Sequence, residues 1–159
     1  MITIAEEGPE HHAAVAALHR AAFGGPYEAD LVAASLVALE DGGVVIGHVL
    51  FSDLPVEVDG APVRAVSLAP MAVRPDRQGR GIGTWLVAEG LPTLRERGRT
   101  AVVVLGHVRY YPRFGFSAEL ARKLASPFPG EAFMALELVP GALAGRAGSV
   151  RYPAAFGIA

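Results

Sequence analysis

A glycine-rich loop near the middle of the chain carries the strongest chemical signal. The loop Gln78-Gly79-Arg80-Gly81-Ile82-Gly83 follows a run typical of a strand and opens a run typical of a helix. Glycine lets the backbone approach a ligand closely, and the first N–H groups of a helix have no partner within the helix. With the positive end of the helix dipole, these donors favour a phosphate group. Arg77 and Arg80 can add charge-assisted contacts.

Two well-known phosphate-binding loops differ from this one. A P-loop requires Gly-x-x-x-x-Gly-Lys-Ser/Thr, and this loop contains no lysine. A dinucleotide fingerprint requires Gly-x-Gly-x-x-Gly after the first strand of the fold. Here Gly79-x-Gly81-x-Gly83 has another spacing and lies in mid-chain. A glycine-rich turn that only joins a strand to a helix is a further alternative.

Tyrosines and histidines are the other residues suited to chemistry. A tyrosine phenol, with a reference pKa near ~10, stays protonated at neutral pH and can donate a proton, so Tyr110 and Tyr111 are candidate acids. His107 titrates near neutrality and is a candidate base, with His48 and Asp53 as weaker candidates. The structural alternatives are tyrosines that only pack their rings and polar residues that are solvated or hydrogen-bonded.

The composition excludes several classes of protein. The 159 residues suit a single domain over residues 1–159. The absence of cysteine excludes disulfide frameworks and a cysteine acyl-enzyme. The net charge is -2 and acidic and basic residues are interspersed, so the sequence shows no basic cluster that would bind nucleic acid. The adjacent His11 and His12 would point to different helix faces, so we expect no metal site.

The N-terminus predicts the cellular location. Residues 1–7 carry two acidic residues, Glu6 and Glu7, where a signal peptide needs positive charge followed by an apolar stretch. No apolar run approaches the ~18–20 residues of a membrane span. We therefore expect a cytoplasmic protein that has no contact with membranes.

The elements expected before the loop begin with a strand and two helices. Alternation over 2–6 predicts a strand, a helix follows from Pro9 to Gly24-Gly25-Pro26, and a short helix is expected over 27–39. Asp41-Gly42-Gly43 and Asp59-Gly60 predict turns in an antiparallel meander. Its strands are expected over 44–51, 56–58, 63–66 and 67–73.

The elements expected from the loop onward complete a mixed α/β pattern. A helix is predicted over 81–97, a central strand over 101–105, and later strands over 132–139 and 150–152. Pro70 cannot donate a ladder hydrogen bond, so it predicts an edge or a bulge in its strand. The strand, helix and next strand around the loop form a βαβ crossover.

Three segments in register resemble the GNAT superfamily of N-acetyltransferases. Gln78-x-x-Gly81-x-Gly83 is similar to the Gln/Arg-x-x-Gly-x-Gly/Ala signature of that superfamily. Met71-Ala72-Val73-Arg74-Pro75 resembles the strand before it, and Tyr110-Tyr111-Pro112-Arg113-Phe114-Gly115-Phe116 resembles the Tyr-x-x-x-Gly-Phe element. The resemblance covers at least residues 66–116.

The resemblance implies a fold and a cosubstrate. The fold would be α/β, with a mixed, mostly antiparallel sheet flanked by helices and one parallel pair of strands splayed at Val73 and Ala101. Acetyl-CoA would lie in that split, and no metal is implied. The residues implied to bind it are Met71, Ala72, Val73, Gln78, Gly79, Arg80, Gly81, Ile82, Gly83 and Thr84.

The resemblance also implies an activity. Acetyl would pass to an amine of a small molecule or a peptide, which would approach near the N-terminal helices and residues 44–53. Tyr111, four residues before Gly115, occupies the place of the family's general acid. Some members carry a glutamate base on the strand before the loop, whereas residues 67–70 contain no carboxylate, so His107 is the candidate base. Without cysteine, direct attack by the amine is the economical mechanism.

Two alternatives to an enzyme remain open at the level of sequence. A non-catalytic acyl-CoA-binding module would keep the loop, and the missing glutamate is compatible with it. A protein-interaction domain would have no affinity for CoA and would tolerate bulky residues at Gly81. A monomer and a homodimer are both compatible with the sequence.

Overall fold

The protein forms one eight-stranded sheet with helices on both faces. In the computed structural model of the chain, residues 1–20, 32–128 and 130–152 are described. The strand order is β1-β2-β3-β4-β5-β7, and β8 pairs with β3 and β6. The strands are β1 (Thr3–Glu6), β2 (Val32–Glu40), β3 (Val44–Val58), β4 (Ala61–Val73), β5 (Ala101–Leu105), β6 (Leu124–Ala125), β7 (Phe133–Glu137) and β8 (Gly148–Val150). The α-helices are α1 (His12–Arg20), α2 (Ile82–Glu96) and α3 (Ala118–Ala121).

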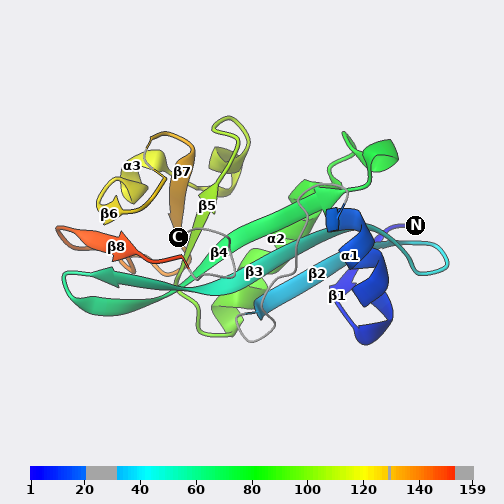
Figure 1. Cartoon of the computed structure of the whole chain (residues 1–159), viewed down its shortest axis with the longest axis horizontal. Helices are drawn as coiled ribbons and strands as arrows, with labels where there is room; N and C mark the ends of the chain where they lie inside the picture. Colours follow the sequence, from blue (N-terminus) through cyan, green and yellow to red (C-terminus); the bar gives the residue numbers. More distant parts are fainter. Residues whose placement is uncertain (21–31, 129, 153–159) are drawn as a thin grey trace.

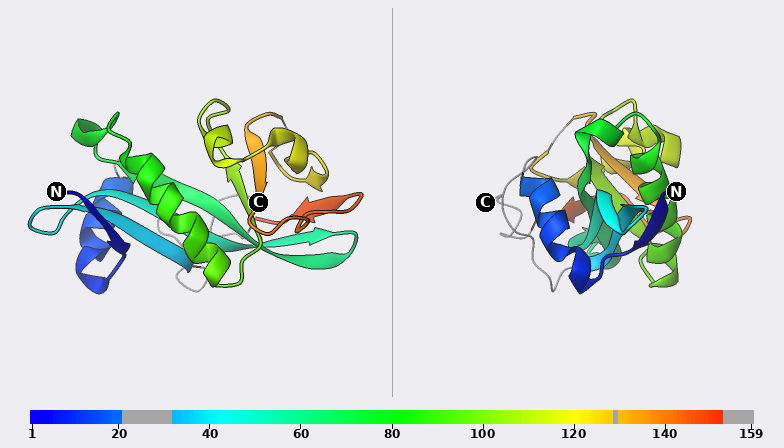
Figure 2. Two further views of the ribbon diagram at one scale, coloured as in Figure 1. Left: turned by 180° about the vertical axis from the view of Figure 1, so that it is seen from behind. Right: turned by 90° about the vertical axis from the view of Figure 1, so that its right-hand side faces the viewer.

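The two longer helices lie on opposite faces of the sheet, as Figures 1 and 2 show together. The helix α2 packs very closely on the sheet at Gly90, where a Cβ atom would lie 2.5 Å from Cε2 of Phe51. Phe51 is fully buried in β3. Such close packing fixes the axis of α2, and hence the place where its N-terminus meets the sheet.

The sequence prediction for residues 27–39 was wrong wherever the structure describes them. Val32–Glu40 form β2, which pairs with β1 on one edge and β3 on the other. The alanines suggested a helix, but small residues suit a strand beneath a tightly packed helix. A Cβ atom at Gly47, directly opposite Ala38, would lie 3.2 Å from Cδ1 of Leu86 in α2. Tertiary packing therefore overrode helix propensity here.

The predicted meander is confirmed, with longer strands than expected. Turns at 41–43 and 59–60 separate β2, β3 and β4, and the last two strands run without interruption. The bulge predicted at Pro70 is also confirmed. Val49 pairs with Met71 and Phe51 with Leu68, so β4 has one more residue than β3 at this point.

The parallel pair of strands separates as predicted, but at another place. Pairing of β4 with β5 covers Ala65–Ser67 and Ala101–Val103, and no further register continues it. Ala101 therefore lies in the paired part, and the split begins after Ser67 and Val103, well before Val73. Figures 1 and 2 show β5 turning away from β4 beyond this point. The edge of β4 that has no strand beside it in the described part of the chain is therefore longer than predicted.

The other predicted elements agree with the structure to different degrees. β1, α1, α2 and β5 lie where they were expected, and β7 lies inside the predicted range 132–139. β8 precedes most of its predicted range 150–152, and α3 and β6 had not been predicted. The expected helix end at 24–26 and the first part of 27–39 lie outside the described residues. No helix in the described ranges is long and apolar enough to span a membrane.

We predict that Gly90→Val destabilises the protein by about 1–3 kcal/mol through overpacking against Phe51. Ala88→Val is the matched control, because Ala88 is exposed on the same helix. Urea unfolding of both variants measures the effect. Equal stability of the two variants would show that the contact with Phe51 does not limit the packing of α2.

Candidate functional site

The loop before α2 holds two glycines in the left-handed conformation. Gly79 has φ 77° and Gly81 has φ 80°, and a Cβ at either position would meet no atom within 4 Å. Glycine is needed there for the backbone conformation and not for lack of space. Trp85 is bonded through its N–H to the Gly81 carbonyl at 2.9 Å. The N–H groups of Ile82, Gly83 and Thr84 precede that first helical bond, as an anion site requires.

Contacts at the base of the loop fix its position. The Gln78 side-chain amide donates to the Val73 carbonyl at 3.0 Å, which ties the loop to the end of β4. Arg77 forms a two-pronged ion pair with Glu40 at the end of β2. The hydrogen bond from Arg77 holds the pKa of the Glu40 carboxyl below its usual value. Arg77, which we had expected to reach phosphate, is thus engaged with carboxylates, including Asp76 at 3.0 Å.

The tyrosine element reaches the loop through Tyr110. The Tyr110 hydroxyl lies 2.9 Å from Oγ1 of Thr84, in the first turn of α2. A Cβ at Gly83 would lie 3.5 Å from the same hydroxyl and 3.6 Å from Sδ of Met71. The Arg113 guanidinium stacks on the Tyr110 ring at 4.3 Å and donates to the Tyr110 carbonyl. The loop, the end of β4 and the tyrosine element therefore meet at one place.

Tyr111 is buried beside this meeting point. Its side chain packs edge-on against Tyr110 and Phe116, and Gly106 leaves room for its ring, which a Cβ there would approach to 2.6 Å. Burial, with a smaller contribution from Tyr110, raises the pKa of Tyr111 to about 12. The Tyr111 hydroxyl has no hydrogen-bond partner among the described residues.

Two pockets border the end of β4. The loop pocket has a volume of about 340 Å³ and includes Gly81, Thr84, Tyr110 and Arg113 in its wall. The α1 pocket has a volume of about 710 Å³ and lies between α1 and the end of β4. Both include Val73 and Gln78, so the two pockets adjoin.

The residues predicted to bind the cosubstrate gather at these pockets, with one exception. Seven line the loop pocket: Val73, Gln78, Gly79, Gly81, Ile82, Gly83 and Thr84. Met71 and Ala72 line the α1 pocket. Arg80 is exposed on the loop and lines neither pocket.

The candidate bases lie in three different settings. His107 is exposed, and its carbonyl accepts hydrogen bonds from the N–H groups of Tyr110 and Tyr111 at 3.0 and 3.3 Å. It lines neither pocket, so its role as the base stays a prediction. Asp53 forms a two-pronged ion pair with Arg99, at 3.0 and 2.8 Å. His48 is fully buried in β3.

Sequence reasoning underrated the residues that support the site. Arg113 belongs to the tyrosine segment, and its place in the loop pocket could have been suspected from that motif. Glu40 lies 37 positions from Arg77, and no local pattern links the two residues. The motif favours Tyr111 over Tyr110 as the acid, but the hydroxyl that contacts the first turn of α2 is that of Tyr110.

A family model and relatives known by sequence match most of this chain. Residues 5–116 match the model of the acetyltransferase (GNAT) family. The uncharacterized N-acetyltransferase YhbS of Escherichia coli is 44% identical over 119 residues, which cover 74% of this chain and 70% of YhbS. YjhQ of Escherichia coli, also an uncharacterized N-acetyltransferase, is 41% identical over 122 residues, which cover 68% of this chain and 66% of YjhQ.

Solved structures resemble the whole described fold. YhbS of Escherichia coli in complex with CoA superposes with a TM-score of 0.83 and 35% identity, over 99% of this chain and 92% of YhbS. A GNAT family acetyltransferase of Brucella melitensis in complex with acetyl-CoA gives a TM-score of 0.75 and 36% identity, over 98% of each chain.

The raised pKa of Tyr111 predicts a pH-dependent loss of stability. The unfolded phenol ionises near pH ~10, whereas the folded one does so near pH 12, so its contribution is complete below pH ~10 and is lost as the pH rises toward 12. At about pH 11 the loss amounts to about 1–1.5 kcal/mol. Urea unfolding should show that wild type loses this much more stability than Tyr111→Phe between about pH 9 and pH 11. If the free energies of unfolding of the two proteins change equally between these pH values, the raised pKa of Tyr111 is contradicted.

Proposed function

The chain belongs to the acetyltransferase (GNAT) family, and on that premise we propose that it transfers an acetyl group from acetyl-CoA directly to a primary amine. The acceptor is a small molecule or an amino terminus. The observation that carries the proposal is that the start of α2 lies beside the edge of β4 that no strand of the described chain pairs: a Cβ at Gly83 would lie 3.6 Å from Met71. Solved relatives at 35% and 36% identity contain CoA and acetyl-CoA, which supports the same cosubstrate here.

The phosphate end of acetyl-CoA would bind at the loop. The N–H groups of Ile82, Gly83 and Thr84 have no hydrogen-bond acceptor within the helix, so they can donate to a phosphate group. The helix dipole favours the negative charge of a pyrophosphate. Gly79 and Gly81 allow the backbone to curve around it. Arg80 is exposed and forms no hydrogen bond or ion pair with the described residues, so it can turn toward phosphate.

The pantetheine arm would bind along β4. Met71, Ala72 and Val73 follow the bulge, where β5 no longer pairs with β4. Pantetheine contains amide groups, which can form the hydrogen bonds that a neighbouring strand would otherwise form. This arrangement places the thioester beside the end of β4, where a backbone N–H near Met71 or Ala72 can stabilise the oxyanion.

Tyr111 is proposed as the general acid that protonates the departing thiolate. Its pKa of about 12 keeps the phenol protonated at neutral pH. Tyr111 itself lines neither pocket, but its ring packs against Tyr110, which lines the loop pocket, so its phenol lies close to the proposed site. The chain contains no cysteine, so the amine attacks the thioester carbon directly and no acyl-enzyme is needed.

The two tyrosines should respond differently to loss of the hydroxyl. We expect Tyr111→Phe to lower turnover at least ~10-fold with little change in acetyl-CoA affinity, because it removes only the proton donor. Tyr110→Phe should instead weaken acetyl-CoA binding roughly 3–10-fold, because it removes a hydrogen-bonding hydroxyl from the loop pocket. Thiol release from acetyl-CoA with a panel of primary amines measures turnover, and calorimetric titration with acetyl-CoA measures affinity.

Two outcomes would count against the proposal. Unchanged turnover in Tyr111→Phe would remove Tyr111 from the mechanism. Binding of acetyl-CoA by wild type without amine-dependent thiol release from any amine in the panel would favour the acyl-CoA-binding module.

A further inference from the structure

Two buried side chains and the half-buried Ser35 form a polar cluster on the α1 face of the sheet. Ser35 donates its hydroxyl to Oε1 of Glu7 at 2.5 Å and lies 2.7 Å from Nε2 of His48. The same Glu7 oxygen lies 3.3 Å from Nε2 of His48. The His48 side chain is 0% exposed and that of Glu7 is 4% exposed. We name Glu7, Ser35 and His48 the buried cluster.

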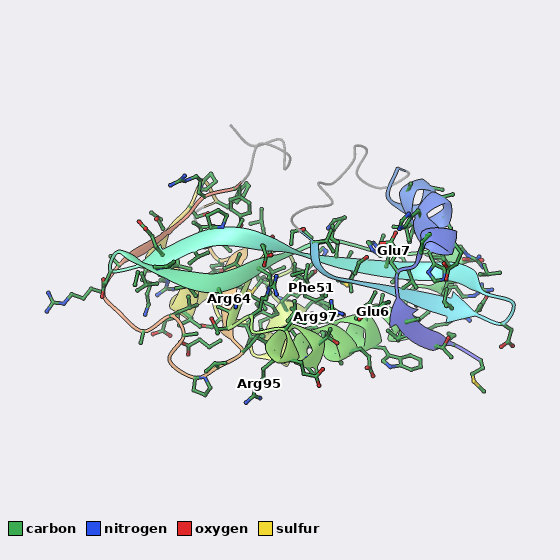
Figure 3. The ribbon with its side chains drawn as sticks, turned by 90° about the horizontal axis from the view of Figure 1, so that it is seen from below. Glu6, Glu7, Phe51, Arg64, Arg95 and Arg97 are labelled. Atoms are coloured by element: carbon green, nitrogen blue, oxygen red, sulfur yellow. The ribbon has the colours of Figure 1, made fainter. Side chains whose placement is uncertain are left out.

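The cluster joins three neighbouring strands. Glu7 follows β1, Ser35 belongs to β2 and His48 to β3. Figure 3 shows Glu7 on the α1 side and the preceding Glu6 on the α2 side, near Arg97. Taking ionisable groups out of water is costly, and well-packed apolar residues of similar volume often give equal or greater stability. A purely structural role therefore leaves the presence of an ionisable pair unexplained.

One end of the cluster leads to solvent. Nε2 of His12 lies 3.8 Å from Oε2 of Glu7, and the His12 side chain is 64% exposed. The other titratable groups on this segment are Glu10 and His11, which lie 3.7 Å apart, and His11 accepts a hydrogen bond from the Gly8 N–H. Ionisable side chains thus run from His48 through Glu7 to His12 at the surface.

The other end of the cluster lies beside the α1 pocket. His48 is directly opposite Ala72 in the pairing of β3 with β4. Side chains of such a pair lie on the same face, about 4.5–5.5 Å apart at Cβ. Ala72 lines the α1 pocket together with Ala14 and Ala17 of α1. Ala72 is therefore both part of the pocket wall and the cross-strand neighbour of His48.

We propose that the buried cluster receives the proton that the acceptor amine must lose before it attacks, with water in the α1 pocket as the carrier. This inference rests on the proposed function. It supplies the base that residues 67–70 lack, without requiring the exposed His107. His48 is a relay residue in this account, because it is buried and does not touch the acceptor.

The proton balance of the reaction closes with this relay. The acceptor ammonium gives one proton through water to His48, and that proton leaves through Glu7 and His12 to solvent. The freed nitrogen lone pair forms a bond to the thioester carbonyl carbon, and the C–S bond breaks with its electron pair on sulfur. Tyr111 protonates the sulfur and regains a proton from the nitrogen. The products are an N-acetyl amide, free CoA thiol and one proton.

Two probe amines separate proton removal from structural effects. 2-Phenylethylamine is an ammonium ion at neutral pH, whereas phenylhydrazine is mostly unprotonated and needs no base before attack. For His48→Gln we expect thiol release with 2-phenylethylamine to fall about 10²-fold at neutral pH, within the range for acid–base catalysis. Release with phenylhydrazine should stay within about threefold of wild type. The defect with 2-phenylethylamine should shrink as the pH rises toward the range where this amine is neutral.

Two further variants protect the test against misfolding. Glu7→Gln keeps the size of the side chain but removes its charge, and it should show the same contrast between the two amines. His11→Gln changes a buried histidine outside the cluster, and it should leave both rates unchanged. Circular dichroism and acetyl-CoA affinity equal to wild type confirm that a variant is folded.

The outcomes separate this inference from the proposed function. Equal losses with both amines in His48→Gln and Glu7→Gln, or no loss in either, would overturn the relay while the transfer activity stands. If wild type releases no thiol with either amine, the proposed transfer to such amines fails. In that case ¹⁵N NMR of the histidine rings decides on the cluster: a His48 ring that gains no proton between about pH 9 and pH 5 contradicts the relay.

Discussion

The end of pairing between β4 and β5 is the constraint on which the rest of the site depends. Pairing stops at Ser67 and Val103, while β4 continues to Val73. Backbone donors and acceptors along that edge need partners, and no strand of the described chain supplies them. The bulge at Pro70 lies where the pairing stops, so the strand changes direction where a ligand would replace its neighbour. The proposed binding of an extended molecule that carries amides rests on this one interruption of the sheet.

The remaining elements bring charge and acid chemistry to the same edge. Gly90 lets α2 pack closely on Phe51, and this contact fixes where the helix begins relative to β4. The Arg77–Glu40 ion pair ties the loop to the end of β2, so the loop is held by contacts that do not involve a ligand. Tyr110 joins the first turn of α2 to the tyrosine segment, whose next residue, Tyr111, is buried. The site is thus preorganised at both ends of the proposed path of the cosubstrate.

The parts of the fold that sequence could predict were those set by local rules. The loop, α2 and β5 follow from glycine conformation, the start of a helix and a short apolar run, and the bulge follows from a proline within a strand. The prediction for β2 was wrong because its alanines reflect packing beneath α2, which the sequence alone does not display. The contacts of Glu7 with Ser35 and His48 depend on the register of three strands, so no spacing in the sequence could reveal them.

Calorimetric titration with acetyl-CoA tests most directly whether the loop is the binding site. Wild type, Gly81→Ala and Gly60→Ala should be compared, because both glycines have φ 80° and a Cβ at either would meet no atom within 4 Å. The backbone strain of about 1–2 kcal/mol is therefore matched, and only Gly81 lies at the loop. The account predicts that wild type and Gly60→Ala bind equally and that Gly81→Ala binds roughly tenfold more weakly. Absence of binding by folded wild type, or equal affinity of all three proteins, would contradict it.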